Sequence, residues 1–98
     1  MRYQLVYSPR SSRDLDKIRR WITDESGSAT IASRFLAQLF DACDSLRRLP
    51  HRFAVYPYSR SWRMMPFGNY LVFFQVVDNE VRIGHVRHSA RRPFFGPQ

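Results

Sequence analysis

The feature that most restricts the fold is a run of eight residues, Tyr70 to Val77, in which Gln75 is the one strongly polar side chain. The run is rich in aromatic and β-branched residues, and a strand without polar alternation is typical of a sheet centre that is covered on both faces. Turn residues flank it, Gly68-Asn69 before and Asp78-Asn79 after. We therefore expect a central strand here, with an antiparallel neighbour on each side.

The strand that follows, predicted from Glu80 to His88, does not alternate simply. Val81 and Ile83 point to one face of an ideal strand, whereas Val86 points to the other. Either both faces are partly covered, or a β-bulge near Gly84 shifts the alternation by one residue. We expect one of these two arrangements.

Two helices are predicted upstream of this sheet. Ser8-Pro9 supplies an N-cap and a first helical residue, and this helix is expected to stop near Gly27. A second helix begins around residues 28–30 and ends at Pro50. Its apolar stripe recurs every three or four residues and consists of Ala32, Phe35, Leu36, Leu39, Cys43, Leu46 and Leu49. The connection is very short, so the helices should pack as an antiparallel hairpin.

Three other segments complete the predicted order. Residues 3–7 indicate a first strand, residues 51–58 a loop or edge segment, and residues 61–67 the strand before the central one. The order is then β-α-α-β-β-β, an α+β fold with a helical hairpin on one face of a small, mainly antiparallel sheet. Ninety-eight residues suffice for one domain, 1–98, in which 89–98 form a basic C-terminal tail.

The charge indicates the kind of partner. A net charge of +8 and a pI of about 10.8 favour polyanions, namely RNA, DNA or an acidic protein. Lys17 is the only lysine, and arginine is the better residue for planar contacts with phosphate or carboxylate. A GC-rich genome, which favours arginine codons, is the alternative explanation of this bias.

Other functional classes have no support in the sequence. Cys43 is the single cysteine, so neither a disulfide framework nor a cysteine-based zinc site is expected within the chain, and we expect no metal or cofactor. Strand-like sequence follows Met1 directly, and no apolar run approaches the roughly 20 residues of a membrane helix. We expect a cytoplasmic protein without a membrane partner.

Three segments together resemble one known family: Ser8-Pro9 with residues 14–18, residues 62–74, and residues 81–92, which end in the pattern Val-x-Ile-x-x-Val-x-His-x-x-Arg-Arg. They are similar to the RelE/ParE superfamily of toxins from type II toxin–antitoxin systems, especially its ParE-like branch. The resemblance covers nearly the whole chain. It implies a toxin that a cognate antitoxin neutralises.

An acidic, flexible antitoxin would suit a chain of charge +8, with folding on binding. We predict that Trp21, Phe53, Tyr56 and Tyr58 form the groove that receives it. The alternative is that these aromatic residues belong to the core.

The resemblance implies one of two activities: ParE-like inhibition of DNA gyrase, or RelE-like cleavage of mRNA on the ribosome. A nuclease would need a base, an acid and a cation near one phosphate, and its candidates are Arg63, His85, Arg87 and His88. Alternation places His85 with Arg87 on one face and His88 on the other. The chain also lacks the arginine that RelE-like enzymes usually carry before the central strand, and it has no lysine-rich region. The ParE-like interpretation is therefore favoured, with ribosome-bound mRNA as the alternative target.

The residues predicted to meet the target are basic, and they are Arg63, Arg87, His88, Arg91 and Arg92. Each also has a structural interpretation: Arg63 could pair with a helix carboxylate, His88 could bond to backbone, and the two tail arginines could be solvated. A third class of function, an inactive toxin relic or a nucleic-acid-binding module, also remains open.

Overall fold

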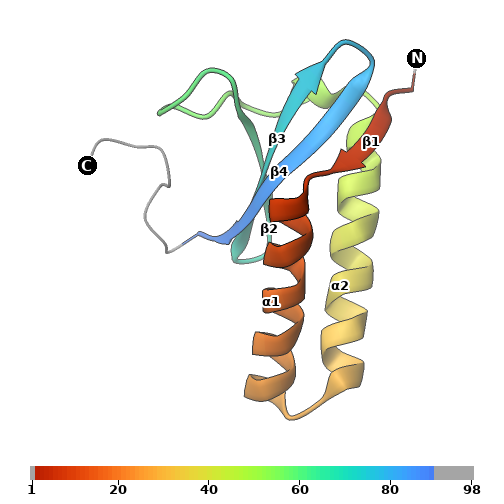
Figure 1. Cartoon of the computed structure of the whole chain (residues 1–98), viewed down its shortest axis with the longest axis vertical. Coiled ribbons are helices and arrows are strands. Elements are labelled where there is room, and N and C mark those ends of the chain that lie inside the picture. The colour runs from red at the N-terminus through yellow and green to blue at the C-terminus, as the bar shows by residue number, and fades with distance from the viewer. Residues whose placement is uncertain (1, 90–98) are drawn as a thin grey trace.

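A computed structural model describes residues 2–89 of the chain. Two helices pack on one four-stranded sheet whose order is β1-β4-β3-β2 (Figure 1). The predicted order β-α-α-β-β-β is confirmed, with β1 at Gln4–Tyr7, α1 at Pro9–Ser26, α2 at Ala29–Asp44, β2 at Arg63–Phe67, β3 at Tyr70–Val77 and β4 at Glu80–His88.

The ends of the helical hairpin are fixed by side chains that the sequence made recognisable. The Ser8 hydroxyl accepts a hydrogen bond from the Ser11 amide (2.9 Å) at the start of α1. Gly27, with a φ of 70°, ends that helix in the left-handed conformation that glycine adopts without cost to a side chain. Ser28 then caps α2 through the Ile31 amide (3.1 Å). The two helices are thus antiparallel neighbours, as expected.

The end of α2 differs from the prediction. The helix stops at Asp44, a short 3-10 turn covers Ser45–Arg47, and Leu49 has a φ of 48° with 75% of its surface exposed. The prediction that the buried stripe reaches Leu49 is therefore wrong. The chain leaves helical geometry before that residue, and the Arg52 guanidinium bonds to carbonyl oxygens released there, including that of Leu49 (3.1 Å).

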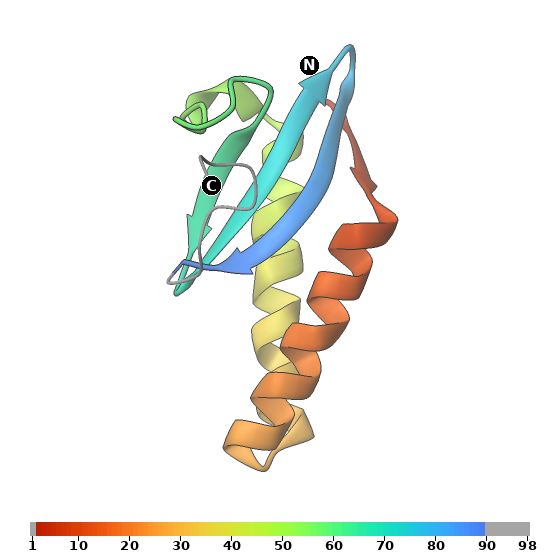
Figure 2. The same ribbon diagram turned by 60° about the vertical axis from the view of Figure 1, so that its left-hand side comes forward.

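The core lies between the hairpin and one face of the sheet, and α2 runs behind the strands in Figure 2. Its fully buried members include residues from α2, β3 and β4, namely Leu36, Leu39, Cys43, Val72, Phe74, Val81 and Ile83. On the opposite face of β3, Phe73 is covered by the ring of Tyr56 at 4.9 Å between centroids. The central strand is therefore buried on both faces over residues 72–74, as its composition predicted.

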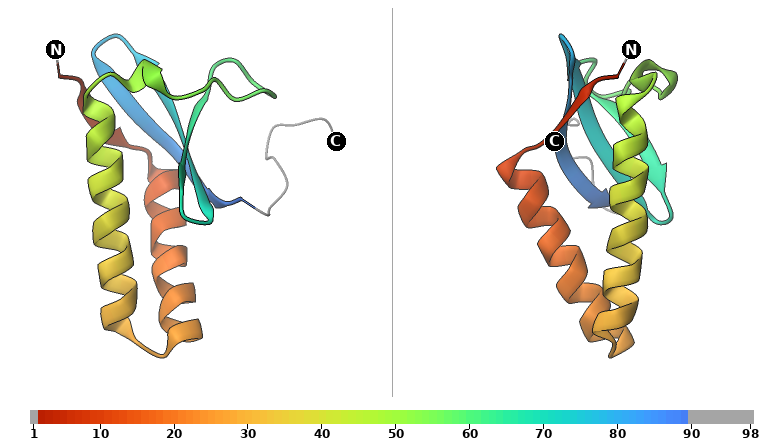
Figure 3. Two further views of the ribbon diagram at one scale, coloured as in Figure 1. Left: turned by 180° about the vertical axis from the view of Figure 1, so that it is seen from behind. Right: turned by 90° about the vertical axis from the view of Figure 1, so that its right-hand side faces the viewer.

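The first strand joins the sheet in parallel with the last. β1 pairs with the first half of β4, from Gln4 opposite Glu80 to Tyr7 opposite Ile83. The chain then turns directly into α1, which runs beside the second half of β4. The turn end of the hairpin extends beyond the sheet (Figure 3). This arrangement leaves one side of α1 facing the end of β4.

Candidate functional site

A β-bulge at Gly84 determines which side chains of β4 face the helices. Opposite β3, Ile83 pairs with Phe74 and His85 pairs with Phe73, so Gly84 is an extra residue without a partner. Ile83 and Val86 therefore both point into the core, as their burial shows. The bulge is one of the two arrangements that the broken alternation predicted.

The backbone groups at the bulge bond to side chains of the α1 region instead of to a strand. The Ser8 hydroxyl donates to the Gly84 carbonyl oxygen (3.0 Å), and the Val86 amide donates to Asp14 Oδ2 (3.1 Å). The Asp14 side chain is only 12% exposed. Since buried backbone groups are costly when unbonded, these two contacts make the bulge compatible with burial.

The outer side of the bulge is covered by Trp62. A Cβ atom on Gly84 would lie 2.2 Å from Cη2 of the Trp62 indole. The same indole meets the His85 ring edge-on, at 5.3 Å between centroids. Glycine at this position is therefore required by the close approach of the indole.

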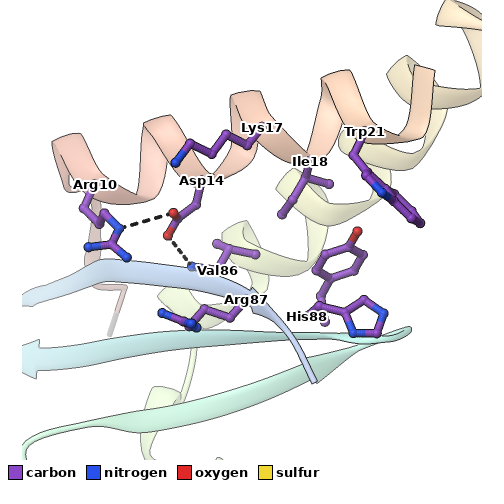
Figure 4. Close-up of a pocket in the computed structure, with 9 residues that line it drawn as sticks. Arg10, Asp14, Lys17, Ile18, Trp21, Val86, Arg87 and His88 are labelled. Carbon is purple, nitrogen blue, oxygen red and sulfur yellow. Dashed lines mark hydrogen bonds and ion pairs between the residues drawn. The ribbon is translucent and has the colours of Figure 1, made fainter. Parts of the chain in front are cut away.

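Between α1 and the end of β4 lies a groove of about 520 Å³, shown in Figure 4. We call it the α1–β4 groove. It is lined by five residues of α1 and four of the sheet, namely Arg10, Asp14, Lys17, Ile18, Trp21, Tyr70, Val86, Arg87 and His88. The α1 residues recur every three or four positions, so they share one helical face. Ile18 and Val86 are buried, while Trp21 is 56% exposed.

Positive charge predominates in the groove. Arg10 and Lys17 come from α1 and Arg87 from β4, and Asp14 is the one carboxylate in the lining. Asp14 Oδ1 lies 3.3 Å from Nε of Arg10, and its other oxygen accepts from the strand. The arrangement suits an anionic group from a partner, next to an apolar patch of Ile18, Trp21 and Val86.

The two histidines of β4 face different environments. His88 points to the helix side, where its ring meets that of Tyr70 at 5.3 Å, whereas His85 lies on the outer face beside Trp62. Burial lowers the pKa of His85, and the positive charge of Arg10 lowers it further. The side chains of His85 and Arg87 alternate with those of Val86 and His88, so the split that the sequence predicted is present.

The structure brings together some of the predicted site residues and not others. Trp21, Arg87 and His88, which the sequence assigned to two different surfaces, line one groove. Arg63 lies elsewhere, opposite Phe74, and donates to the carbonyl oxygen of Phe53 (2.7 Å). Its guanidinium bonds to carbonyl oxygens before β2 and not to a helix carboxylate, and Arg63 does not line the α1–β4 groove with Arg87 and His88. Arg91 and Arg92 lie outside the described residues.

The four aromatic residues predicted to form the antitoxin groove do not lie together. Phe53 packs edge-on against Phe74 (6.3 Å between centroids), at the margin of the core. Tyr56 and Tyr58 are neighbours on the loop that covers Phe73, at 5.4 Å from each other. Among the four, Trp21 alone reaches the α1–β4 groove.

Arg10, Asp14 and Lys17 were not among the site residues predicted from the sequence. A signal was present, since residues 10, 14, 17 and 21 follow the 4-3-4 spacing of one helical face. Because most of these residues are charged, their pattern indicated a face of the helix that is exposed to solvent. What the sequence could not show is that the end of β4 lies opposite this face.

Within residues 2–89, no three His, Cys, Asp or Glu side chains lie close enough together to hold a metal ion. Neither helix in this part of the chain is long and apolar enough to cross a membrane.

A family model identifies the family of this chain, and two solved structures share its fold. Residues 5–93 match the family model described as ParE toxin of the type II toxin–antitoxin system parDE. A structure of the chromosomal ParDE system from P. aeruginosa is similar in fold, with a TM-score of 0.79 and 17% identity over 88% of this chain and 95% of that one. A structure of the RelBE2 toxin–antitoxin complex from Mycobacterium tuberculosis has a TM-score of 0.64 and 21% identity, covering 90% and 99%. No curated protein sequence matches the chain.

Proposed function

Since the chain belongs to the ParE toxins of type II toxin–antitoxin systems, we propose that it inhibits DNA gyrase by binding and is neutralised by an acidic antitoxin. Gyrase and such an antitoxin act in the cytoplasm, so the proposal includes a cytoplasmic location.

The observation that carries the binding mode is the separation of the two histidines of β4, which alternate onto opposite faces of the strand. Cleavage of RNA needs a base, an acid and a cation that converge on one phosphate. His88 faces α1 and lines the groove together with Arg87, whereas His85 lies on the outer face beside Trp62. The two histidines therefore do not converge, and the arrangement favours a contact surface over a nuclease centre.

We place target binding at the end of β4. Arg87 and His88 stand there, Arg10 and Lys17 of α1 add charge beside them, and the predicted target residues Arg91 and Arg92 follow in the sequence. Arg63 is left out of this surface because its guanidinium is bonded to the loop carbonyls of residues 51 and 53.

We place the acidic antitoxin segment in the α1–β4 groove. Arg10 and Lys17 would receive its carboxylates, and the exposed Trp21 would receive an apolar side chain next to Ile18. Because Arg87 and His88 line the same groove, a segment bound there would cover part of the target surface. Neutralisation would then follow from direct occlusion.

The test uses purified toxin in a gyrase supercoiling assay. We expect inhibition by the native chain, loss of most inhibition in an Arg87→Glu/His88→Ala variant, and full inhibition by Arg34→Glu, which alters an exposed α2 residue outside the groove. Added antitoxin should restore supercoiling. Unaffected gyrase at saturating toxin would refute the proposed activity.

The second candidate is ribosome-dependent mRNA cleavage, favoured by the pairing of His88 with the Tyr70 ring beside Arg87. These groups offer an acid or base and a cation within one groove. Translation extracts that contain the toxin decide between the two: cuts within codons of ribosome-bound mRNA would support this activity, and intact mRNA would exclude it.

A further inference from the structure

The bulge at Gly84 determines the orientation of every side chain that follows it in β4. In a strand without a bulge, His85 and Arg87 would continue the alternation of Val81 and Ile83 and point into the core. Val86 would then be exposed on the outer face. The extra residue, Gly84, exchanges the two faces for every later side chain of β4. Val86 is therefore buried, and Arg87 is not. The composition of the groove therefore depends on a one-residue register.

A bulge does not by itself hold that register. β1 pairs with β4 only as far as Ile83, so the backbone groups beyond it that face away from β3 have no strand partner, and here their partners come from the start of α1. Asp14 accepts from the Val86 amide (3.1 Å), and Ser8 donates to the Gly84 carbonyl (3.0 Å). These two contacts join positions that are 72 and 76 residues apart in the sequence.

Asp14 is itself held in place. Its second oxygen lies 3.3 Å from Nε of Arg10, one turn earlier in the helix. The carboxylate is 12% exposed, so its bond to the strand is shielded from competing water. The Ser8 hydroxyl is fixed in the same way, because it also accepts the capping bond from the Ser11 amide.

We propose that Asp14 is a positioning residue for the partner surface of this protein. It lines the groove, and its part is to fix the bulge and so the sides on which Arg87 and His88 are presented. This role rests on the proposed function in one respect, namely that Arg87 and His88 contact the target. The register itself is a property of the fold and is measured separately.

The experiment compares three variants of the whole chain. Asp14→Ala removes the acceptor, and Asp14→Asn keeps an oxygen for the Val86 amide but loses the charge. Asp16→Ala is the matched control, since Asp16 is 63% exposed on the same helix and pairs with Arg20. Amide hydrogen exchange at Val86 and the proton contact between the Tyr70 and His88 rings report the register. Supercoiling inhibition reports the activity.

We expect Asp14→Ala to raise exchange at Val86 about tenfold, the effect of one lost hydrogen bond, to remove the Tyr70–His88 contact and to lose inhibition. Asp14→Asn should restore all three readouts, and Asp16→Ala should change none. Loss of inhibition with exchange and ring contact intact would overturn the proposal, because Asp14 would then touch the target itself. Altered exchange with full inhibition would also overturn it.

Two further arms keep the test decisive. If Asp14→Ala does not fold, Ser8→Ala perturbs the same bulge from its other side and should give the same loss of the ring contact. If the native chain does not inhibit gyrase, the proposed target is wrong. The exchange and ring-contact results still confirm or refute the positioning role of Asp14.

Discussion

At the scale of the residue, Gly84 is the position that tolerates least change. Gly84→Ala would bring a methyl group to 2.2 Å from the Trp62 indole, so either the indole or the strand must move. Overpacking of this kind costs about 1–3 kcal/mol, and we expect a loss of unfolding free energy in that range, measured by urea denaturation.

The companion experiment removes the obstacle. In a Trp62→Ala background the added methyl group no longer meets the indole, so Gly84→Ala should cost at least about 1 kcal/mol less than it does in the native chain. Equal costs in the two backgrounds would show that the backbone, and not the indole, excludes a side chain at Gly84.

The bulge also shows which residues a sequence can locate. The broken alternation around Gly84 was visible because Val81, Ile83 and Val86 are apolar and cannot all face water. Trp62 covering Gly84 was not visible, since the two are far apart in the sequence and nothing local joins them. For the same reason the sequence showed that Arg87 and His88 are basic, but it did not show that they line a groove with Arg10 and Lys17.

A second residue-scale prediction concerns Cys43. Burial raises the pKa of this thiol to about 11, although its hydrogen bond with Tyr7 lowers it. Because the folded pKa exceeds the ordinary thiol value of 9.0, the stabilisation is complete below pH 9 and is lost as the pH rises towards 11. We expect the unfolding free energy to fall by roughly 2 kcal/mol across that window on this account.

Comparison with Cys43→Ala isolates the thiol. The variant should be less stable at pH 7, because a buried side chain becomes smaller, yet its stability should fall less steeply between pH 8 and pH 10.5. Parallel curves for the two proteins would show that the thiol does not contribute to the alkaline loss of stability. The measurement is urea denaturation at each pH.

At the scale of the element, the two helix starts offer a matched pair. Ser8 caps α1 and also bonds to the bulge, whereas the hydroxyl of Ser28 caps α2 without a contact to the sheet. Loss of a cap costs about 1 kcal/mol, and a buried carbonyl that loses its donor adds a similar amount. Ser8→Ala should therefore destabilise the protein by about 1 kcal/mol more than Ser28→Ala. Equal effects in thermal or urea unfolding would contradict a role of Ser8 beyond capping.

Most helices and strands could be predicted from the sequence because the residues that begin and end them lie within or next to them. Ser8-Pro9, Gly27 and Ser28 mark helix ends through backbone geometry, and the turns around β3 contain residues suited to tight turns. The end of α2 was misplaced because Leu49 keeps the helical spacing of apolar residues although the chain has already left the helix. The parallel pairing of β1 with β4 has no local signature, since it joins residues 4–7 to residues 80–83.

At the scale of the whole molecule, the net charge of +8 overstates what is available to a partner. Several arginines are bonded within the chain: Arg47 to the Tyr3 carbonyl, Arg52 to the end of α2, and Arg63 to the loop before β2. These guanidinium groups stabilise segment ends that lack regular structure. Arg10 pairs with Asp14 (3.3 Å), but Arg10 and Lys17 both line the groove beside an apolar patch that can also receive a partner.

This distinction gives a prediction about the antitoxin complex. Arg10→Ala/Lys17→Ala and Arg13→Ala/Arg20→Ala each remove two positive charges from α1, but only the first pair lines the groove. If the antitoxin segment binds in the groove, the first double variant should weaken binding at least tenfold at low salt. The second should weaken it little, because screened surface charges contribute only to long-range attraction. Titration calorimetry or fluorescence anisotropy with the antitoxin measures both.

The dependence on salt sharpens this comparison. Binding to the native chain should weaken as salt rises, because carboxylates of the antitoxin meet cations in the groove. Arg10→Ala/Lys17→Ala should show a flatter dependence, whereas Arg13→Ala/Arg20→Ala should keep a slope close to the native one. If both variants lose the same affinity and slope, net charge alone attracts the antitoxin and the groove is not its binding site. If neither variant changes, the antitoxin binds a different face of the molecule, and direct occlusion of Arg87 and His88 is excluded.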